Sequence, residues 1–403
     1  MFTDLGPAPD VISPIWAEPL AARIGQLMRR PKRVAWIYRT PDTSTFRYRV
    51  ANMVAAINHD ESSDIGAAWF SETELDSINH LVGRLDALVL VRYPFSAPLQ
   101  RLVDRARHHD VRLIFDSDDL VFDPELVQVV MDAVGADRED FRNWQLWFAY
   151  MAQLNATMSA CRGGLTTGTP LRQKMAPHFP RGEVAIVPNF LDRQQEAYSR
   201  ALLAAKRGTG WAREGPVTIG YFSGTPTHAH DFAIAAPAIA RLLRADHGVR
   251  LRVVGRLDVV DELAEFGDQI EVLEFMDYLS LQRAIAEVEI NVAPLQHHYF
   301  TACKSDLKYF EAAAVGTWTV ASSSPAFSDA IEDGVTGRVA RAHQWDEALD
   351  EAVALARDTQ AYSARAEVAA ERVYQRYGWD RHTDTITRAL DLDGSASTTG
   401  SVS

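Results

Sequence analysis

The chain has 403 residues, a formal net charge of -13 at pH 7 and two cysteines, Cys161 and Cys303. This length exceeds one ordinary domain and suits two domains, each with its own core. The acidic balance argues against a nucleic-acid partner, because binding to a phosphate backbone needs clustered surplus cations. Two cysteines far apart in the sequence, without metal-ligand spacing, indicate a reduced, cytoplasmic protein.

The N-terminal region shows no signal-peptide pattern, and no apolar run approaches the roughly 18 residues that a membrane span requires. Residues 16–33 (WAEPLAARIGQLMRRPKR) combine apolar side chains with a basic end. Such a segment can make weak peripheral contact with an anionic membrane surface. Pro19, Gly25 and Pro31 interrupt the pattern, however, so a helix that packs against the protein is the favoured interpretation.

Apolar, strand-like runs alternate with helical stretches through the first half of the chain. The strongest runs cover residues 33–38, 67–70, 87–92, 111–115 and 165–167. This alternation predicts a parallel sheet with helices on its faces. Arg47 and Arg49 lie at the start of the helix after the first strand, where arginines with only a structural role and arginines that contact a ligand would show the same pattern.

An acidic cluster, DSDDL at residues 116–120, follows the fourth predicted strand. Three carboxylates at the carboxyl end of a strand have several interpretations. Asp116 and Asp118 form an Asp-x-Asp pair whose oxygens suit Mg²⁺ or Mn²⁺. Alternatively the cluster only caps the next helix.

The second half of the chain repeats the alternating pattern after a polar stretch at residues 193–216, which we interpret as linker and within which the domain boundary is assigned to residues 201–216. Predicted strands cover residues 217–222, 251–255, 270–273, 290–293 and 317–321. The small residues that follow the first of these strands precede a helix and form a candidate phosphate cradle; they are Ser223, Gly224 and Thr225. His228 and His230 could form a metal pair, but the sequence offers no further ligands near them.

A helix is predicted from about Ser305 to Val315, with Ser305 as its N-cap. Lys304 and Lys308 lie near its amino end, and Glu311 follows one turn later. A helix N-terminus with N–H groups and two lysines can bind an anion, and phosphate is the obvious candidate. A solvated ion pair between Lys308 and Glu311 would explain the same residues.

Residues 291–321, with Asn189 in VPNFLD and the later DGVTG, resemble the nucleotide-sugar half of glycosyltransferase family 4, the group 1 enzymes of GT-B fold. In that family a Glu-x7-Glu motif spans this loop and helix, and the second Glu holds the donor ribose. Glu311 occupies that second position, whereas Cys303 occupies the first, where the usual Glu contacts the donor sugar. The segment CKSDLKYFEAA resembles a branch of the family with Lys-Ser at the start of the helix.

The resemblance implies an α/β chain of GT-B fold, with two Rossmann-like doubly wound domains facing across a cleft. It implies a retaining transfer of a sugar from a nucleotide diphosphate sugar to a hydroxyl acceptor, with no metal and no further cofactor. The residues expected to bind the donor are Ser223, Gly224, Thr225, Arg256, Met276, Lys304, Ser305, Lys308 and Glu311. Those expected in the chemistry are Asp118, Glu311 and Lys304, and Asp118 lies nearest the place where family members often carry a histidine that faces the donor sugar. Those expected near the acceptor are Arg47 and Asn189. The resemblance also implies that Arg47 and Arg49 could meet the negative charge of the acceptor or of the donor diphosphate.

The predicted domains are an acceptor-side domain at residues 1–200 and a nucleotide-sugar domain at residues 217–376. A helix at residues 377–392 is expected to cross back to the first domain, and a low-complexity tail covers residues 393–403. Two alternatives to an active transferase stay open. One is a GT-B epimerase or hydrolase. The other is a catalytically weak subunit that binds nucleotide sugar, which Cys303 and the lack of Lys or Arg in residues 223–231 favour. The donor base, the sugar, the acceptor and the oligomeric state are not readable from the sequence.

Overall fold

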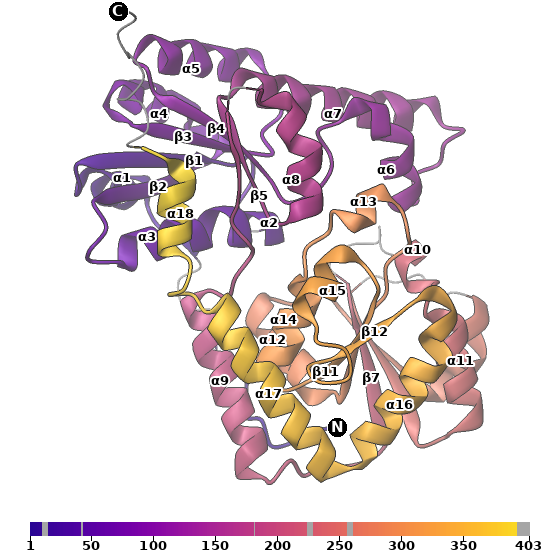
Figure 1. The fold of residues 1–403 in the computed structure, drawn as a ribbon. Helices are drawn as coiled ribbons and strands as arrows, with labels where there is room; N and C mark the ends of the chain where they lie inside the picture. Colours follow the sequence, from indigo (N-terminus) through magenta and orange to yellow (C-terminus); the bar gives the residue numbers. More distant parts are fainter. Residues whose placement is uncertain (10–14, 42, 181, 224–228, 256–260, 393–403) are drawn as a thin grey trace, which may run out of the picture. The chain divides into compact units, whose positions relative to one another are not determined.

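The computed structural model describes residues 1–9, 15–41, 43–180, 182–223, 229–255 and 261–392 (Figure 1). Contacts between residues divide the chain into two compact units. The N-terminal unit comprises residues 13–127, 144–190 and 379–403, and the C-terminal unit comprises residues 1–12, 128–143 and 191–378. The predicted tail at residues 393–403 lies outside the described residues.

The N-terminal unit contains a six-stranded parallel sheet in the order β2-β1-β3-β4-β5-β6. All five residues of β3 are buried, as expected for a strand covered on both faces by helices. The predicted strands of this half are therefore confirmed, with small shifts at their ends. The strands are β1 (Lys32–Ile37), β2 (Ile65–Phe70), β3 (Ala87–Val91), β4 (Arg112–Ser117), β5 (Gly163–Thr166) and β6 (Val184–Ile186).

Helices flank this sheet, and side-chain caps stabilise the first turns of some of them, such as α5. The hydroxyl of Ser96 accepts a hydrogen bond from the N–H of Leu99 at the start of α5, and Pro98 occupies the first turn. The helices of this half are α1 (Leu20–Met28), α2 (Ser44–Phe46), η2 (Arg47–Ala51), α3 (Asn52–His59), α4 (Leu75–Leu81), α5 (Ala97–His108), most of α7 (Phe141–Ala160), α8 (Thr169–Met175) and α18 (Thr383–Leu390), whereas α6 (Val127–Ala133) belongs, except for its first residue, to the C-terminal unit. Of these, η2 is a π-helical turn, an arrangement that is frequent at functional sites.

Helix α1 lies within the segment considered for membrane contact. Leu27 is fully buried in the core of the N-terminal unit, and Leu20, Ile24 and Met28 pack against that core. The apolar side of the helix is therefore used inside the protein, so this segment does not provide an apolar face for a membrane. None of the helices in the described part of the chain has the length and apolar character needed to span a bilayer.

The C-terminal unit contains a second six-stranded parallel sheet, in the order β12-β11-β10-β7-β8-β9. Its central strands are fully buried, so the α/β architecture predicted for this half is confirmed. The strands are β7 (Val217–Phe222), β8 (Val249–Val254), β9 (Ile270–Leu273), β10 (Ile290–Ala293), β11 (Trp318–Ser322) and β12 (Arg338–Ala340).

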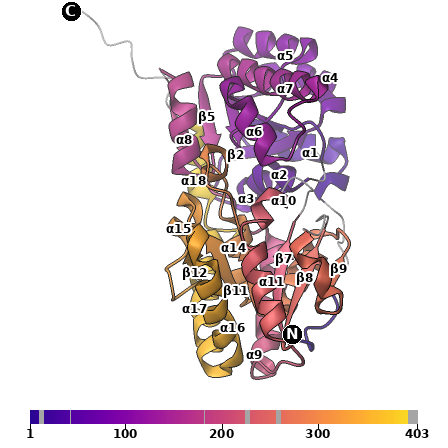
Figure 2. The ribbon, with the colours of Figure 1, turned by 90° about the vertical axis from the view of Figure 1, so that its right-hand side faces the viewer.

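The helices of the C-terminal unit include two long ones, α16 and α17, which pack beside each other (Figure 2). Helix α17 also packs against α14, the helix that carries Glu311. The helices are α9 (Arg193–Gly208), α10 (Ala229–Phe232), α11 (Ala236–Ala245), α12 (Tyr278–Glu287), α13 (Tyr299–Ala302), α14 (Leu307–Ala314), α15 (Pro325–Ala330), α16 (Trp345–Arg357) and α17 (Thr359–Tyr377).

The segment assigned as a linker differs from the expectation. Residues 193–208 form α9, which starts at the side-chain cap of Asp192 and contacts α12 and α14. Gln195, Leu203 and Lys206 of this helix are buried in the C-terminal unit. The sequence of α9 reads as polar because several of its buried positions carry polar side chains, whose partners come from distant parts of the chain.

Candidate functional site

Each sheet has one point where its strand order reverses. In the N-terminal unit this point lies between β1 and β3, and in the C-terminal unit it lies between β7 and β10. Ligands of doubly wound sheets bind beyond the carboxyl ends of the strands at such points. The loops that follow these four strands are therefore the first places to search for functional side chains.

In the C-terminal unit, Ser223 directly follows β7 and is 5% exposed. Its backbone N–H donates to the carbonyl of Val254 at 3.0 Å, which fixes the start of the candidate phosphate cradle. The rest of that cradle, Gly224 and Thr225, lies outside the described residues, as do His228 and Arg256. The ring of His230 contacts the carbonyl of Asp132 through Nδ1 at 3.0 Å, so this nitrogen is not available as a metal ligand.

Helix α14 follows the other loop, and its start corrects one prediction. The helix begins at Leu307 and its N-cap position is Asp306, so Ser305 is not the N-cap. The Asp306 carboxylate makes no capping bond to the helix and instead accepts a short hydrogen bond from the hydroxyl of Tyr377. Burial raises the pKa of Asp306, although the Tyr377 hydrogen bond lowers it. The start of α14 is thus held by Tyr377, the last residue of α17.

The two lysines of the predicted phosphate site are each held over an aromatic ring. Lys304 Nζ lies 4.6 Å from the ring centre of Phe300, and Lys308 Nζ lies 4.7 Å from that of Tyr221 in β7. Loss of solvent lowers the pKa of Lys308 to about 8, although the nearby Asp231 raises it. The cation–π contacts keep both ammonium groups at the switch point between β7 and β10.

Asp231 is a site residue that the sequence analysis did not identify. Its carboxylate is 3% exposed and accepts a hydrogen bond from the backbone N–H of Gln296 at 3.0 Å. It also acts on the pKa of Lys308 and of His298. Asp231 therefore links helix α10, after β7, to the loop after β10. In the sequence Asp231 is only an acidic residue at the end of THAHD, where it could equally be a helix-capping residue.

Glu311 is 5% exposed and is surrounded by amide groups. Gln195 donates to its carboxylate at 3.4 Å, and Gln282 donates to its backbone carbonyl at 2.7 Å. The two glutamines contact each other at 3.2 Å, so α9, α12 and α14 meet at this carboxylate. Nothing in the sequence pointed to Gln195 or Gln282, since both arrive from helices distant in the chain.

Two further predicted positions of the C-terminal unit differ in accessibility. Cys303 is 4% exposed, so its thiol is enclosed by the protein where the family has a sugar-contacting Glu. Met276 lies in the loop after β9 and is partly buried, beside Phe275, which is 72% exposed. Asp277, the next residue, caps α12. The predicted contact of Met276 with a nucleobase stays a prediction.

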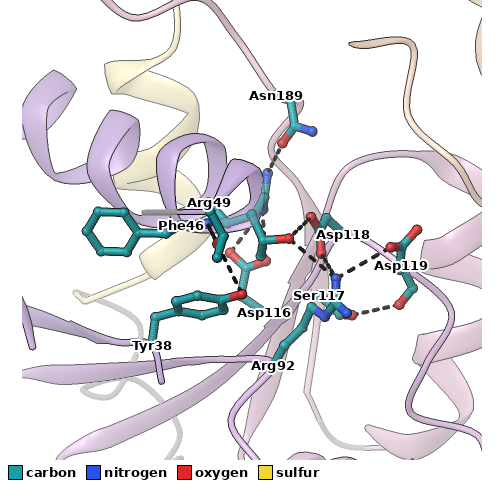
Figure 3. A network of polar contacts seen from close by, with 11 residues as sticks. Tyr38, Phe46, Arg49, Arg92, Asp116, Ser117, Asp118, Asp119 and Asn189 are labelled. Carbon is teal, nitrogen blue, oxygen red and sulfur yellow. Dashed lines mark hydrogen bonds and ion pairs between the residues drawn. The ribbon is translucent and has the colours of Figure 1, made fainter. Parts of the chain in front are cut away.

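In the N-terminal unit the polar side chains at the carboxyl ends of β1, β3 and β4 form the network of Figure 3. Its buried layer is an ion pair between Arg49 and Asp116, both 0% exposed. Two parallel bonds of 2.9 and 3.0 Å join them, and Arg49 also donates to the carbonyl of Val187 at 2.6 Å. Burial raises the pKa of Asp116 to about 6, although Arg49 lowers it.

This ion pair bears on the interpretations of Arg49 and of the acidic cluster. Arg49 is enclosed and paired, so it does not meet a substrate. Asp116 has both carboxylate oxygens on Arg49, which argues against the Asp-x-Asp cation site. Among the residues that the structure describes, no three His, Cys, Asp or Glu side chains are grouped to hold a metal ion.

The outer layer of the network contains Asp118, which lies directly beyond β4 as predicted (Figure 3). Its carboxylate accepts from Arg92 at 3.0 Å and from the Thr45 hydroxyl at 2.9 Å. Arg92 also contacts Asp119 at 3.4 Å. Although burial lowers it, these carboxylates raise the pKa of Arg92 above its ordinary value. Arg92 has a φ of 41°, an unfavourable backbone conformation for a side chain other than glycine.

The predicted acceptor residues Arg47 and Asn189 are both buried, at 8% and 3% exposure. The guanidinium of Arg47 lies over the ring of Tyr48, 4.5 Å from its centre. The side-chain oxygen of Asn189 accepts from Arg49 at 3.3 Å. Asn189 therefore supports the buried ion pair, and contact of either residue with an acceptor stays a prediction.

Arg92 and Thr45 were not singled out by the sequence analysis. A charged residue at the carboxyl end of a buried strand, as in ALVLVR, was a usable signal for Arg92. Thr45 lies in a short loop-to-helix segment, where a threonine is ordinary. Its hydrogen bond to Asp118 could be recognised only from the structure, in which the loop after β1 lies beside the loop after β4.

Comparisons with known proteins bear on the family and the fold. The family described as "Glycosyl transferases group 1" matches residues 216–358. HepE of Anabaena, solved with UDP and glucose, matches with a TM-score of 0.60 at 12% identity, covering 89% of this chain and 98% of that chain. Sucrose-phosphate synthase of Thermosynechococcus elongatus matches with a TM-score of 0.58 at 12% identity, with the same coverage. The comparison with curated proteins found no match.

The α,α-trehalose-phosphate synthase of Burkholderia xenovorans has the same architecture, with a TM-score of 0.55 and 10% identity. It is covered over its full length, and 89% of this chain is included. At these identities the likeness establishes the fold. Both six-stranded units are included in that likeness, whereas the family match covers most of the C-terminal unit only.

Proposed function

We propose that the protein is a retaining glycosyltransferase, from the premise that residues 216–358 match the "Glycosyl transferases group 1" family and that the chain has the GT-B fold. It transfers a sugar from a nucleotide diphosphate sugar to a hydroxyl acceptor. The observation that carries the proposal is the pair of ammonium groups, Lys304 and Lys308, at the switch point between β7 and β10.

The donor diphosphate binds at the amino end of α14. The N–H groups of its first turn and the two ammonium groups supply positive charge there, and Ser305 adds a hydroxyl. Lys308 is partly desolvated, so its interaction with a phosphate is less screened than that of a surface lysine. Ser223, after β7, faces the same switch point from the neighbouring strand.

The donor ribose binds at Glu311. A carboxylate accepts hydrogen bonds from two adjacent hydroxyl groups, which is the chemistry that a ribose offers. The amides of Gln195 and Gln282 fix this carboxylate and its helix, so the two carboxylate oxygens of Glu311 are oriented before the nucleotide sugar binds. The loop with Met276 would hold the base through backbone groups.

The transfer proceeds on one face of the sugar. The acceptor oxygen forms a bond to the anomeric carbon while the bond from that carbon to the diphosphate breaks. The acceptor proton passes to the departing phosphate oxygen, so no covalent enzyme intermediate and no metal are required. Lys304, Lys308 and the N–H groups of α14 stabilise the charge that develops on the diphosphate. Asp118 orients the acceptor.

The proposal is tested by measuring transfer and hydrolysis with a panel of UDP-, GDP-, dTDP- and ADP-sugars. For the active donor, we expect Lys308→Met to lower kcat/KM by about 100-fold, as for loss of one charged stabilising group. Lys174→Met, which removes a lysine from α8, is the matched control and should leave kcat/KM unchanged. Unchanged turnover in Lys308→Met or in Glu311→Ala would contradict the assigned donor site. The configuration of the product, read by NMR, tests retention.

A second candidate function follows from Cys303. Its thiol is enclosed and takes the place of the Glu expected to contact the donor sugar. A protein that lacks this contact could bind a nucleotide sugar without transferring it. Tight donor binding without turnover for every donor in the panel would favour this function, whereas hydrolysis or epimerisation without an acceptor would favour the GT-B alternatives.

A further inference from the structure

Helix α7 exposes large apolar side chains in its first half (Figure 1). Phe141, Leu146 and Phe148 have exposed fractions of 70%, 66% and 52%. Residues 143–160 of the same helix include no Asp, Glu, Lys, Arg or His, although 24% of the whole chain is charged. A helix that faces solvent carries charged and polar side chains on its outer side, so the outer side of α7 has the composition of an interface.

The inner side of α7 is already used by the N-terminal unit. Met151, Leu154 and Met158 are buried on this side. The Thr157 hydroxyl donates to the carbonyl of Tyr93 at 2.7 Å, which fixes the rotation of the helix about its own axis. A partner of α7 must therefore approach the opposite side of the helix.

That opposite side carries one stripe, in which three large side chains precede three small ones at about 3.6 residues per turn. We name these six residues the α7 stripe: Phe141, Trp144, Phe148, Ala152, Ala156 and Ser159. Each of them is exposed or partly buried. Leu146 lies outside the stripe, on the flank between it and the buried side of the helix.

The two halves of the α7 stripe mirror each other about residue 150. Phe148 and Ala152 lie two residues from it on either side, and Phe141 and Ser159 lie nine residues from it. Two copies of the helix that pack antiparallel across a two-fold axis at residue 150 would therefore place each large side chain against a small one. Such alternation lets two helices pack closely without leaving a void. In a two-fold contact every pair occurs twice, so the stripe is its own complement.

The charge of the protein favours the same face. Each copy carries a formal net charge of -13, so two copies repel each other where acidic surfaces meet. Contact through residues 143–160 brings no charged side chain of this segment against its equivalent. The neighbouring Arg142 is paired with Asp140 at 2.8 Å, so it is not a lone cation that would attract an anionic membrane.

The area of the α7 stripe suits a reversible dimer. An aromatic side chain has about 150–250 Å² of surface, so Phe141 and Phe148 together expose about 200–300 Å² in each copy. With the rest of the stripe, two copies would bury about 1,000 Å² in total, which is near the lower limit of a specific interface. An interface of this size corresponds to a dissociation constant in the micromolar range.

We propose that α7 forms the interface of a homodimer in which the two copies of the helix pack antiparallel through the α7 stripe. The proposal does not depend on the proposed transferase activity, because the stripe shares no residue with the proposed donor and acceptor sites.

Sedimentation velocity of the full-length protein between about 1 and 200 μM measures the association. We expect a reversible equilibrium between monomer and dimer. Phe148→Glu should raise the dissociation constant by at least about tenfold, because each dimer would bury two unpaired carboxylates. Leu146→Glu is the matched control, since it adds the same charge at an exposed position of the same helix outside the stripe. It should change the dissociation constant by less than about twofold.

Crosslinking tests the orientation of the two helices without introducing a charge. In a Cys161→Ala background, Phe141→Cys is mixed with Ser159→Cys and treated with a short bismaleimide. In the antiparallel pair these two positions meet, whereas two copies of the same position lie about 27 Å apart along the helix, at about 1.5 Å per residue. The mixture should therefore give a covalent dimer, and each variant alone should not.

Several results would overturn the proposal. They are a protein that is monomeric at about 200 μM, equal effects of Phe148→Glu and Leu146→Glu, no covalent dimer in the mixture, or a covalent dimer with either cysteine variant alone. Binding to liposomes by a protein that stays monomeric would also overturn it and would assign this face to a membrane. Circular dichroism verifies that each variant is folded.

Discussion

The buried ion pair of Arg49 and Asp116 supports a prediction whose size follows from the structure. Arg49→Met removes the guanidinium that both oxygens of Asp116 contact and leaves a carboxylate that is 0% exposed. Breaking a buried pair by removing one partner costs about 3–5 kcal/mol. The variant also leaves the carbonyl of Val187 without the donor that now lies 2.6 Å away.

A second estimate comes from the proton balance of Asp116. Without Arg49 the buried carboxyl should be neutral in the folded state, while in the unfolded chain it ionises with its ordinary pKa of 3.8. Taking up that proton at pH 7.5 costs about 5 kcal/mol, and the cost falls by about 1.4 kcal/mol per pH unit. Because the folded pKa lies above the unfolded one, the stability of the variant should recover as the pH falls toward 4.

The assay is urea unfolding followed by circular dichroism between pH 4.5 and 8. Wild type and Arg49→Met are compared with Arg142→Met, which breaks an exposed pair with Asp140 and should have no measurable effect. The double variant Arg49→Met, Asp116→Leu should regain most of the lost free energy, because it buries no charge. A loss below about 1 kcal/mol in Arg49→Met, or a loss that does not change with pH, would refute this account of the pair.

Four further outcomes are expected. UDP affinity should fall as the pH rises through about 8, where Lys308 loses its proton, and titration calorimetry should find no such fall in Lys308→Arg. Burial lowers the pKa of Lys206 to about 7. Between pH 7 and 10.5 the unfolded chain therefore binds more protons than the folded protein, so the free energy of unfolding should rise with pH over that window. Urea titrations of Lys206→Met should show no such rise. Gly316→Ala should destabilise by about 2 kcal/mol or more in thermal melts, because φ is 68° and a Cβ would lie 2.7 Å from the Trp211 ring. Tyr377→Phe should cost about 1–3 kcal/mol by calorimetry, since Asp306 loses its donor.

The sequence predicted the strands well because the central strands are buried on both faces. Runs such as Ala87–Val91 and Val217–Phe222 are apolar throughout, and this signal depends only on local composition. The helix that carries Glu311 was also predicted, since its apolar spacing is regular. The helix was predicted to begin at about Ser305, but it begins at Leu307. The side chain of Asp306, at the N-cap position, accepts a hydrogen bond from Tyr377 of another helix, a contact that the local sequence does not indicate.

The roles of site residues whose partners lie far away in the chain could not be predicted from the sequence. Arg49 resembled a candidate substrate contact, and only the placement of β4 beside β3 and of Val187 near η2 identified it as a structural cation. Gln195 lay in a stretch that read as linker, yet it touches Glu311. Such residues have no local pattern, because the function of each is defined by a contact with a residue far away in the chain.

The two switch points carry different charged groups. Beyond β7 and β10 two ammonium groups lie over aromatic rings, and the buried carboxylate of Asp231 is engaged with the backbone of the next loop. Beyond β1 and β3 the guanidinium of Arg92 contacts the carboxylates of Asp118 and Asp119. The first arrangement suits the diphosphate binding proposed above, because ammonium groups and the N–H groups at the start of a helix both attract phosphate oxygens.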